Sequence, residues 1–253
     1  MLKKITKRDQ EFEKKIRKLP DNWLDYNPFL ILESRGRGNA EFWKFILYRQ
    51  QRDAVRSLFF AHSNQHPFVG HQIKRTSGEI VISSQVLLKA YYLRYCVLLM
   101  QACGDKLSQL LRNTLDIKEW RIKGNKGIEK IKASEDNTTL TILVKHLRLN
   151  EKEPKPLFTA INSYLKNDSV KIIVFQLANE IKHKWVTSYR GEGLSPIKNP
   201  IVQEKDSSGK LTKEVISIGM SRGINIDLHI RHALIVNNLF VEMADEISAL
   251  LEH

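Results

Sequence analysis

The chain has 253 residues, of which 42% are hydrophobic, enough to bury one large core or a compact domain with an N-terminal extension. This composition excludes a disordered tail. The 41 Lys and Arg residues exceed the 28 Asp and Glu residues, giving a formal net charge of +13. Such a charge favours polyanions in general, namely RNA, DNA, nucleotides or an acidic membrane surface. No long polybasic tract concentrates the excess.

The cysteines and the apolar runs indicate a reducing, aqueous environment. Cys96 and Cys103 fall on one predicted helix about two turns, or ~10 Å, apart. That distance is too long for a disulfide in place, so both are expected to be buried thiols. No N-terminal signal pattern is present, and Lys89 and Arg94 interrupt the longest apolar run before it reaches bilayer-spanning length. We therefore expect a cytoplasmic protein without a membrane span.

Residues 1–82 are expected to form an N-terminal helical extension. Residues 3–18 mix charged and apolar side chains at helical spacing, and Pro20 closes the segment. A glycine-containing loop at 34–39 precedes a second predicted helix over 41–61, whose apolar residues recur with the helical period.

A long helix is predicted from Ser83 or Ser84 to about residue 115, with a serine able to cap its first turn. Tyr91, Tyr92 and Tyr95 fall within it; they can stack on bases, but in an apolar helix they are expected to pack in the core. The basic, glycine-containing segment 120–136 is expected to be an exposed connection or an irregular short element.

The remaining pattern predicts an all-α helical bundle over 83–253 with one small insert. Short helices are expected at 139–149 and 156–165, and a last helix at 226–251. Two β-prone runs flank the turn at 206–209 and predict a small β-hairpin insert near 200–219.

The segment 168–185 carries the most informative pattern in the chain. A helix starting after Asp168, with that carboxylate as its cap, places apolar residues on one stripe: Val170, Ile173, Val174, Leu177 and Ile181. A second, partly apolar face carries Ile172, Phe175, Asn179, His183 and Val186. A helix with two apolar faces is sandwiched, so Asn179 and His183 are expected in a partly buried seam.

A helix that ends in Asn179-x-x-x-His183 and continues into a basic and aromatic tail resembles the HEPN superfamily of helical-bundle proteins. Ribonucleases of that superfamily usually carry an arginine directly before the polar residue of this motif. Here Ala178 occupies the arginine position. The resemblance covers about Ser83 to His253 and consists of the motif and the order of the helices.

The resemblance implies an RNA-directed protein of bacterial defence or toxin type that works as a homodimer, with an antitoxin or another protein as a further partner. As a metal-independent endoribonuclease without cofactor, it would use His183 for acid-base chemistry and Asn179 to orient phosphate. Arg190 is the candidate to replace the missing arginine, and Lys182, Lys184 and Tyr189 are candidate RNA contacts. The alternative is a catalytically inactive module that binds RNA or a nucleotide, or dimerises.

Two other histidine groups have weaker patterns. His62, His66 and His71 include an i,i+4 pair, but no His-Glu-x-x-His arrangement or cysteine accompanies them, so a metal site is disfavoured. His229 and His232 lie on the last predicted helix and are expected to face the same seam as His183, or to be ordinary bundle or surface histidines.

Overall fold

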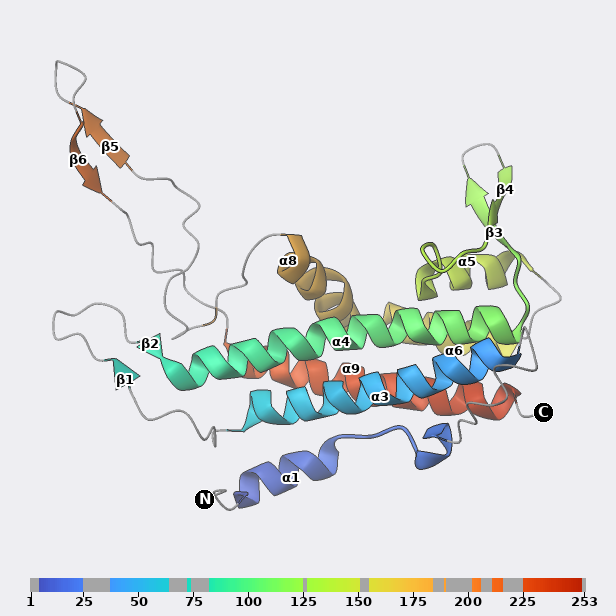
Figure 1. Cartoon of the computed structure of the whole chain (residues 1–253), viewed down its shortest axis with the longest axis horizontal. Coiled ribbons are helices and arrows are strands. Elements are labelled where there is room, and N and C mark those ends of the chain that lie inside the picture. The colour runs from blue at the N-terminus through green and yellow to red at the C-terminus, as the bar shows by residue number, and fades with distance from the viewer. Residues whose placement is uncertain are drawn as a thin grey trace.

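The computed structural model describes residues 5–24, 37–63, 72–73, 82–124, 127–150, 155–183, 189, 202–205, 211–215 and 225–251. These residues form a mostly helical bundle with short antiparallel hairpins, which agrees with the predicted helical bundle and small hairpin but adds hairpins that were not predicted. Three long helices run side by side along the longest dimension of the molecule (Figure 1). They are α3 (Arg37–His62), α4 (Ser84–Thr114) and α9 (Ile226–Leu251).

Shorter helices cover this three-helix layer. They are α1 (Lys7–Lys15), the 3-10 turn η1 (Asp21–Leu24), α5 (Leu140–Leu149) and α6 (Lys155–Lys166). Of these, α1, α5 and α6 match the predicted positions to within a few residues, whereas the turn η1 was not predicted. The helix expected after Asp168 is continuous in the chain but has three parts: α7 (Asp168–Val170), the π-helical segment η2 (Lys171–Leu177) and α8 (Ala178–His183).

In the described part of the chain, the strands form three two-stranded antiparallel sheets. They are β1 (Gln72–Ile73) with β2 (Ile82–Ser83), β3 (Glu119–Gly124) with β4 (Gly127–Lys132), and β5 (Val202–Lys205) with β6 (Leu211–Val215). The last pair confirms the hairpin predicted near 200–219.

The expectation for 120–136 was wrong, because β3 and β4 make a regular hairpin there. The hairpin is anchored by Trp120, whose ring is fully buried and whose Nε1 donates to Oδ1 of Asn137 at 2.8 Å. Gly127 has a φ of 127°, a conformation that favours glycine, at the start of β4. A buried anchor at one strand position therefore holds a hairpin whose other side chains are largely polar and exposed.

The core is continuous across the predicted boundary at residue 82, because Leu47 and Leu58 of α3 are fully buried in the same cluster as the core residues of α4 and α9. A buried polar contact reinforces this layer. Nε2 of Gln51 donates to Oδ1 of Asn237 at 3.0 Å, and Nδ2 of Asn237 donates to the carbonyl of Arg17 at 2.9 Å. The N-terminal helices are thus a layer of the bundle.

The two cysteines are buried free thiols, as predicted, and burial raises the pKa of both. Among the described residues, Val86–Thr114 within α4 is long and apolar enough to cross a membrane by length and composition. The core helix of a soluble protein passes the same test, and α4 packs against α3 and α9. The cytoplasmic location stays a prediction.

The expectation that the tyrosines of α4 lie in the core was wrong for two of the three. Tyr91 is 61% exposed and Tyr95 is 48% exposed. They lie one helical turn apart on the side of α4 that faces away from the fully buried Leu93 and Val97. The rings of Tyr91 and Tyr95 are therefore accessible on the surface of α4.

Candidate functional site

The helix that carries Asn179 and His183 begins with a cap one residue earlier than expected. Oδ1 of Asn167 accepts the backbone N–H of Ser169 at 2.9 Å, so Asn167 and not Asp168 is the N-cap. Asp168 is the first helical residue, and its exposed carboxylate accepts from Nζ of Lys171 at 2.8 Å. This bond and the nearby ammonium lower the pKa of Asp168.

The middle of the helix is π-helical over Lys171–Leu177, where the backbone N–H of Ala178 reaches the carbonyl of Ile173, five residues back. A π-helical turn holds more residues than an α-helical turn, so it changes which side chains follow one another on a face. Nε2 of Gln101 on α4 donates to the carbonyl of Val174 at 3.5 Å and contacts this segment from the side. Such segments are frequent at functional sites.

The first face of the helix is buried as predicted. Val170, Ile173, Val174 and Leu177 are buried, and Ile181 packs against the core. The second face is not sandwiched: Phe175 is 37% exposed, and Asn179 and His183 are exposed. The expected partly buried seam was therefore wrong, because among the described elements the helix packs mainly on one side, against α4 and α9.

Asn179 and His183 lie four residues apart in the α-helical end of the element, which places their side chains on one face about 6 Å apart. Neither side chain makes a hydrogen bond to another described residue. Within the described part of the chain, these side chains do not tether neighbouring helices to one another. An amide and an imidazole are thus displayed together on the surface.

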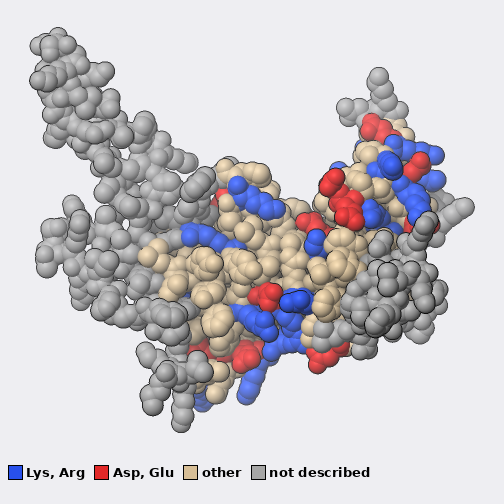
Figure 2. All heavy atoms as spheres, viewed as in Figure 1, with Lys and Arg blue, Asp and Glu red and all other residues tan. Residues whose placement is uncertain are grey.

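The charge around this pair is mixed. Lys182 is exposed, and basic side chains gather over α8 in the surface view (Figure 2). Asp105 of α4 lies within electrostatic range of Lys182. Burial raises the pKa of Asp105, while the charges of Lys182 and Lys106 oppose that shift. The other two candidate cations, Lys184 and Arg190, lie outside the described residues.

Ala178 occupies the position at which the resemblance expects an arginine, and its side chain is fully buried. It points into the bundle, whereas Asn179 and His183 face solvent. A guanidinium at this position would enter the core. Any cation that serves the exposed pair must therefore come from another position of the chain or from a second copy.

Tyr189 is almost completely buried, which corrects its assignment as an RNA contact. Its hydroxyl lies 3.1 Å from Nδ1 of His229, and the guanidinium carbon of Arg94 lies 5.7 Å from the centre of its ring. Burial is the main cause that lowers the pKa of His229; the His232 charge adds to it and Glu180 opposes it. Tyr189 is therefore a packing residue between α4 and α9.

His232 has a separate contact, because its Nδ1 lies 2.9 Å from Oγ of Ser169, near the start of the helix that runs from Asp168 to His183, which we call the signature helix. His229 thus contacts Tyr189, which comes after that helix, and His232 contacts Ser169, near its start. Neither makes a hydrogen bond to His183 in the described part of the chain. Of the two alternatives, His229 and His232 are ordinary bundle histidines, and they do not share a seam with the exposed His183.

The second histidine group is described only at His62, because His66 and His71 lie outside the described residues. The His62 ring stacks on Phe12 with 3.7 Å between centroids, and its buried Nε2 has no hydrogen-bond partner among the described residues. No set of three potential metal ligands occurs within the described part of the chain.

Comparison with known proteins gives no family assignment: no family model, curated protein or solved structure matches the chain.

Proposed function

We propose that the protein is an RNA-directed, HEPN-like homodimer in which two copies of the Asn179 and His183 pair form one metal-independent endoribonuclease site. The observation that carries the proposal is the joint exposure of these two side chains on one helical turn, without a hydrogen bond to the described bundle. Their lack of a packing role leaves them available to a ligand. The net charge of +13 favours a polyanion as that ligand.

The chemistry requires a base and an acid. An imidazole removes the proton from a ribose 2′-hydroxyl, the 2′-oxygen attacks phosphorus, and the bond to the 5′-oxygen breaks. A second imidazole protonates the departing 5′-oxygen, which leaves a 2′,3′-cyclic phosphate and a free 5′-hydroxyl. Because one chain presents one His183, we assign the two roles to the His183 side chains of two protomers.

Asn179 and Lys182 would supply the remaining contacts. The Asn179 amide can donate to a non-bridging phosphate oxygen, and the Lys182 ammonium can offset its negative charge. Arg190 and Lys184 remain candidate cations from the sequence. The exposed ring of Phe175, one turn before Asn179, provides apolar area for contact between two copies of this face.

The burial of Ala178 favours a second function, a catalytically inactive module that binds RNA or a nucleotide. Without a guanidinium at this position, the stabilisation of phosphate charge depends on lysines or on Arg190. Lysine is a point charge and lacks the planar two-pronged geometry of arginine. The same exposed pair would then hold RNA without cleaving it.

The experiment incubates purified protein with single-stranded RNA in the presence of a chelator and identifies the product ends. The proposal expects fragments with a 2′,3′-cyclic phosphate and a 5′-hydroxyl, and loss of cleavage in His183→Ala with an unchanged melting temperature. His229→Ala is not a suitable control because His229 is buried; Lys130→Ala on β4 is exposed and should cleave normally. RNA binding without cleavage would favour the inactive module.

A further inference from the structure

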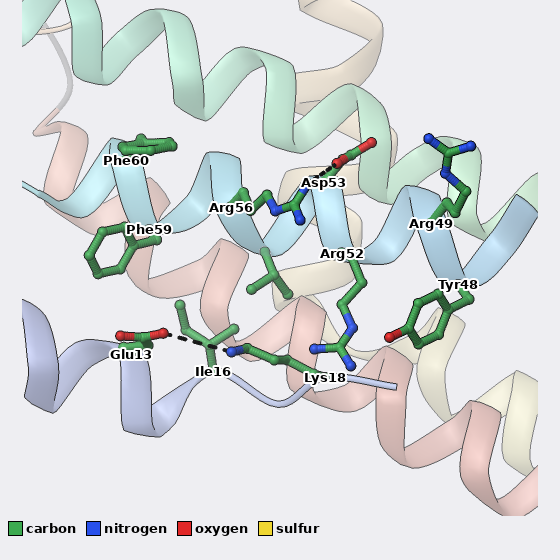
Figure 3. Close-up of a pocket in the computed structure, with 11 residues that line it drawn as sticks. Glu13, Ile16, Lys18, Tyr48, Arg49, Arg52, Asp53, Arg56, Phe59 and Phe60 are labelled. Carbon is green, nitrogen blue, oxygen red and sulfur yellow. Dashed lines mark hydrogen bonds and ion pairs between the residues drawn. The ribbon is translucent and has the colours of Figure 1, made fainter. Parts of the chain in front are cut away.

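A groove of about 600 Å³ lies on the outer side of α3, against α1 and the segment that follows it (Figure 3). This volume is within the range of ligand pockets. Its lining combines basic and aromatic side chains: Glu13, Ile16, Lys18, Tyr48, Arg49, Arg52, Asp53, Val55, Arg56, Phe59 and Phe60. None of them belongs to the Asn179 and His183 site.

Four cations face two carboxylates in this lining. Arg49, Arg52 and Arg56 are spaced i, i+3, i+7 along α3, and Lys18 comes from the segment after α1. Two of the cations already pair with the lining carboxylates: Arg56 with Asp53 at 3.2 Å and Lys18 with Glu13 at 3.7 Å. These pairs are exposed, so each contributes little to stability and a phosphate can compete for the cation.

The other two arginines are held against aromatic rings. The guanidinium carbon of Arg52 lies 4.9 Å from the ring centre of Tyr48, and its NH2 contacts Asp21 at 2.6 Å, while its buried Nε has no hydrogen-bond partner among the described residues. The Arg49 guanidinium lies 5.7 Å from the Phe45 ring and makes no ion pair with a described carboxylate. Within the described part of the chain, the Nε of Arg52 thus has no hydrogen-bond partner and the Arg49 guanidinium has no carboxylate partner.

A row of aromatic rings continues from this groove onto α4. Phe59 lies 5.8 Å from Phe60, Phe60 lies 5.1 Å from Tyr92, and Tyr92 lies 5.4 Å from Tyr91, all between ring centroids. Phe60 is 40% exposed, and Tyr91 is more exposed still. Tyr95 extends the row by one helical turn. The surface over α4 is largely uncharged, whereas basic side chains gather along α3 (Figure 2).

We propose that this surface, the α3–α4 track, binds single-stranded RNA, with phosphates on Arg49, Arg52 and Arg56 and bases stacked on Phe60, Tyr91 and Tyr95. A basic groove with exposed aromatic rings next to it is the combination that holds single strands, because each base offers a face for stacking and each nucleotide a phosphate. In a duplex the base faces are stacked on one another and cannot stack on these rings. An acidic peptide could pair with the arginines but carries no bases to stack on the aromatic row. The inference rests on the proposed function only for the choice of RNA over single-stranded DNA.

The test measures the affinity of the full chain for a fluorescent single-stranded RNA of about 12 nucleotides, a length within the usual site size. Its 2′-hydroxyls are methylated so that it cannot be cleaved. The double variant Arg49→Ala/Arg56→Ala should weaken binding and reduce the slope of log K against log salt by about 1.4, or ~0.7 for each lost phosphate contact. Tyr91→Ala/Tyr95→Ala should weaken binding by roughly tenfold or more and leave this slope unchanged.

The matched control is Lys130→Ala/Lys132→Ala on the exposed strand β4, which removes the same charge from another surface. Its affinity should stay within about twofold of wild type, since distant charges are screened. Equal losses in the control and the arginine variant would overturn the track in favour of general charge attraction. Equal affinity for duplex RNA, or no effect of the tyrosine variant, would overturn base stacking.

The outcomes separate this inference from the proposed ribonuclease function. Track-dependent RNA binding in a protein that never cleaves RNA would support the track and contradict the nuclease. Cleavage that depends on His183, combined with RNA affinity that all track variants leave unchanged, would support the nuclease and overturn the track.

Discussion

The Tyr189 hydroxyl lies 3.1 Å from Nδ1 of His229, 40 positions later in the chain. This contact holds Tyr189, six residues after the end of the signature helix, against α9, and its ring is buried inside the bundle. A tyrosine in a basic tail, which the sequence suggested as an RNA contact, is therefore part of the packing between α4 and α9.

Replacing Tyr189 with phenylalanine removes the hydroxyl and leaves the buried Nδ1 of His229 without this partner. We expect Tyr189→Phe to lower the free energy of unfolding by about 1–3 kcal/mol, the usual cost of an unsatisfied buried polar group. RNA affinity should not change. Chemical denaturation and RNA titration measure the two quantities. Weaker RNA binding at unchanged stability would restore Tyr189 as an RNA contact.

Two asparagines provide a matched comparison of exposed and buried amides. Asn179→Ala should change the free energy of unfolding by less than about 0.5 kcal/mol, because the side chain is exposed. Asn237→Ala should cost about 1–3 kcal/mol, because it removes the hydrogen bonds that the Asn237 side chain makes with the buried Gln51 amide and the Arg17 carbonyl. RNA cleavage or binding should fall in the first variant and persist in the folded second one. The reverse pattern would make Asn179 a structural residue.

Restoring the arginine of the HEPN pattern should damage the fold. Ala178 is fully buried, so Ala178→Arg forces a long charged side chain into the core and should cost at least about 3 kcal/mol. The control is Asn179→Arg, which places the same side chain one residue later on the surface and should leave stability within about 0.5 kcal/mol of wild type. A stable Ala178→Arg protein with increased cleavage would show that position 178 can reach the site.

Stability should fall as the solution is acidified, because His62, His146 and His229 each have a lowered pKa, mainly as a result of burial. The folded state favours neutral rings, so the unfolded state takes up protons first. Their contribution is complete above the unfolded pKa of about 6.5 and is lost as the pH falls below it. His146 shows the reason, since its Nδ1 accepts the N–H of Arg121 at 2.9 Å and cannot do so when protonated.

The measurement is a series of denaturation curves between about pH 8 and about pH 5, on both sides of the ordinary histidine pKa. His146→Gln removes one of the titrating rings and should flatten the dependence of stability on pH. At about pH 8, where the ring is neutral in both states, the difference in free energy of unfolding between His146→Gln and wild type gives the cost of the substitution itself. A variant that keeps the full wild-type slope would exclude His146 as a contributor.

The sequence predicted the long helices well because their apolar residues recur with the helical period and their ends carry caps. The last helix, Ile226–Leu251, has the predicted bounds, and Thr139 caps α5 as a threonine before an apolar run should. The β3–β4 hairpin was missed because its alternating side chains are mostly basic. The alternation of Trp120 and Ile122 with charged residues before a glycine turn was the available signal.

The exposure of the candidate site could not be predicted from helical spacing. An apolar residue such as Phe175 suggests burial, but whether a second layer covers that face depends on packing of distant elements. The π-helical segment also changes the phase between its first and last residues, which a fixed period of 3.6 ignores. The exposure of Tyr91 and Tyr95 could not be predicted for the same reason, since it depends on which elements cover that side of α4. The α3 groove had a signal in the sequence that was overlooked, namely the spacing of Arg49, Arg52 and Arg56.

The most direct test of the central claim is the nuclear magnetic resonance signal of the His183 imidazole during titration with 2′-O-methylated single-stranded RNA, which cannot be cleaved. The signal is assigned by its absence in His183→Ala. We predict that the ring protons of His183 shift on addition of RNA, that Asn179→Ala reduces the shift, and that the buried His229 signal changes little. An unchanged His183 signal at RNA concentrations that saturate binding would contradict the claim that this exposed pair contacts RNA.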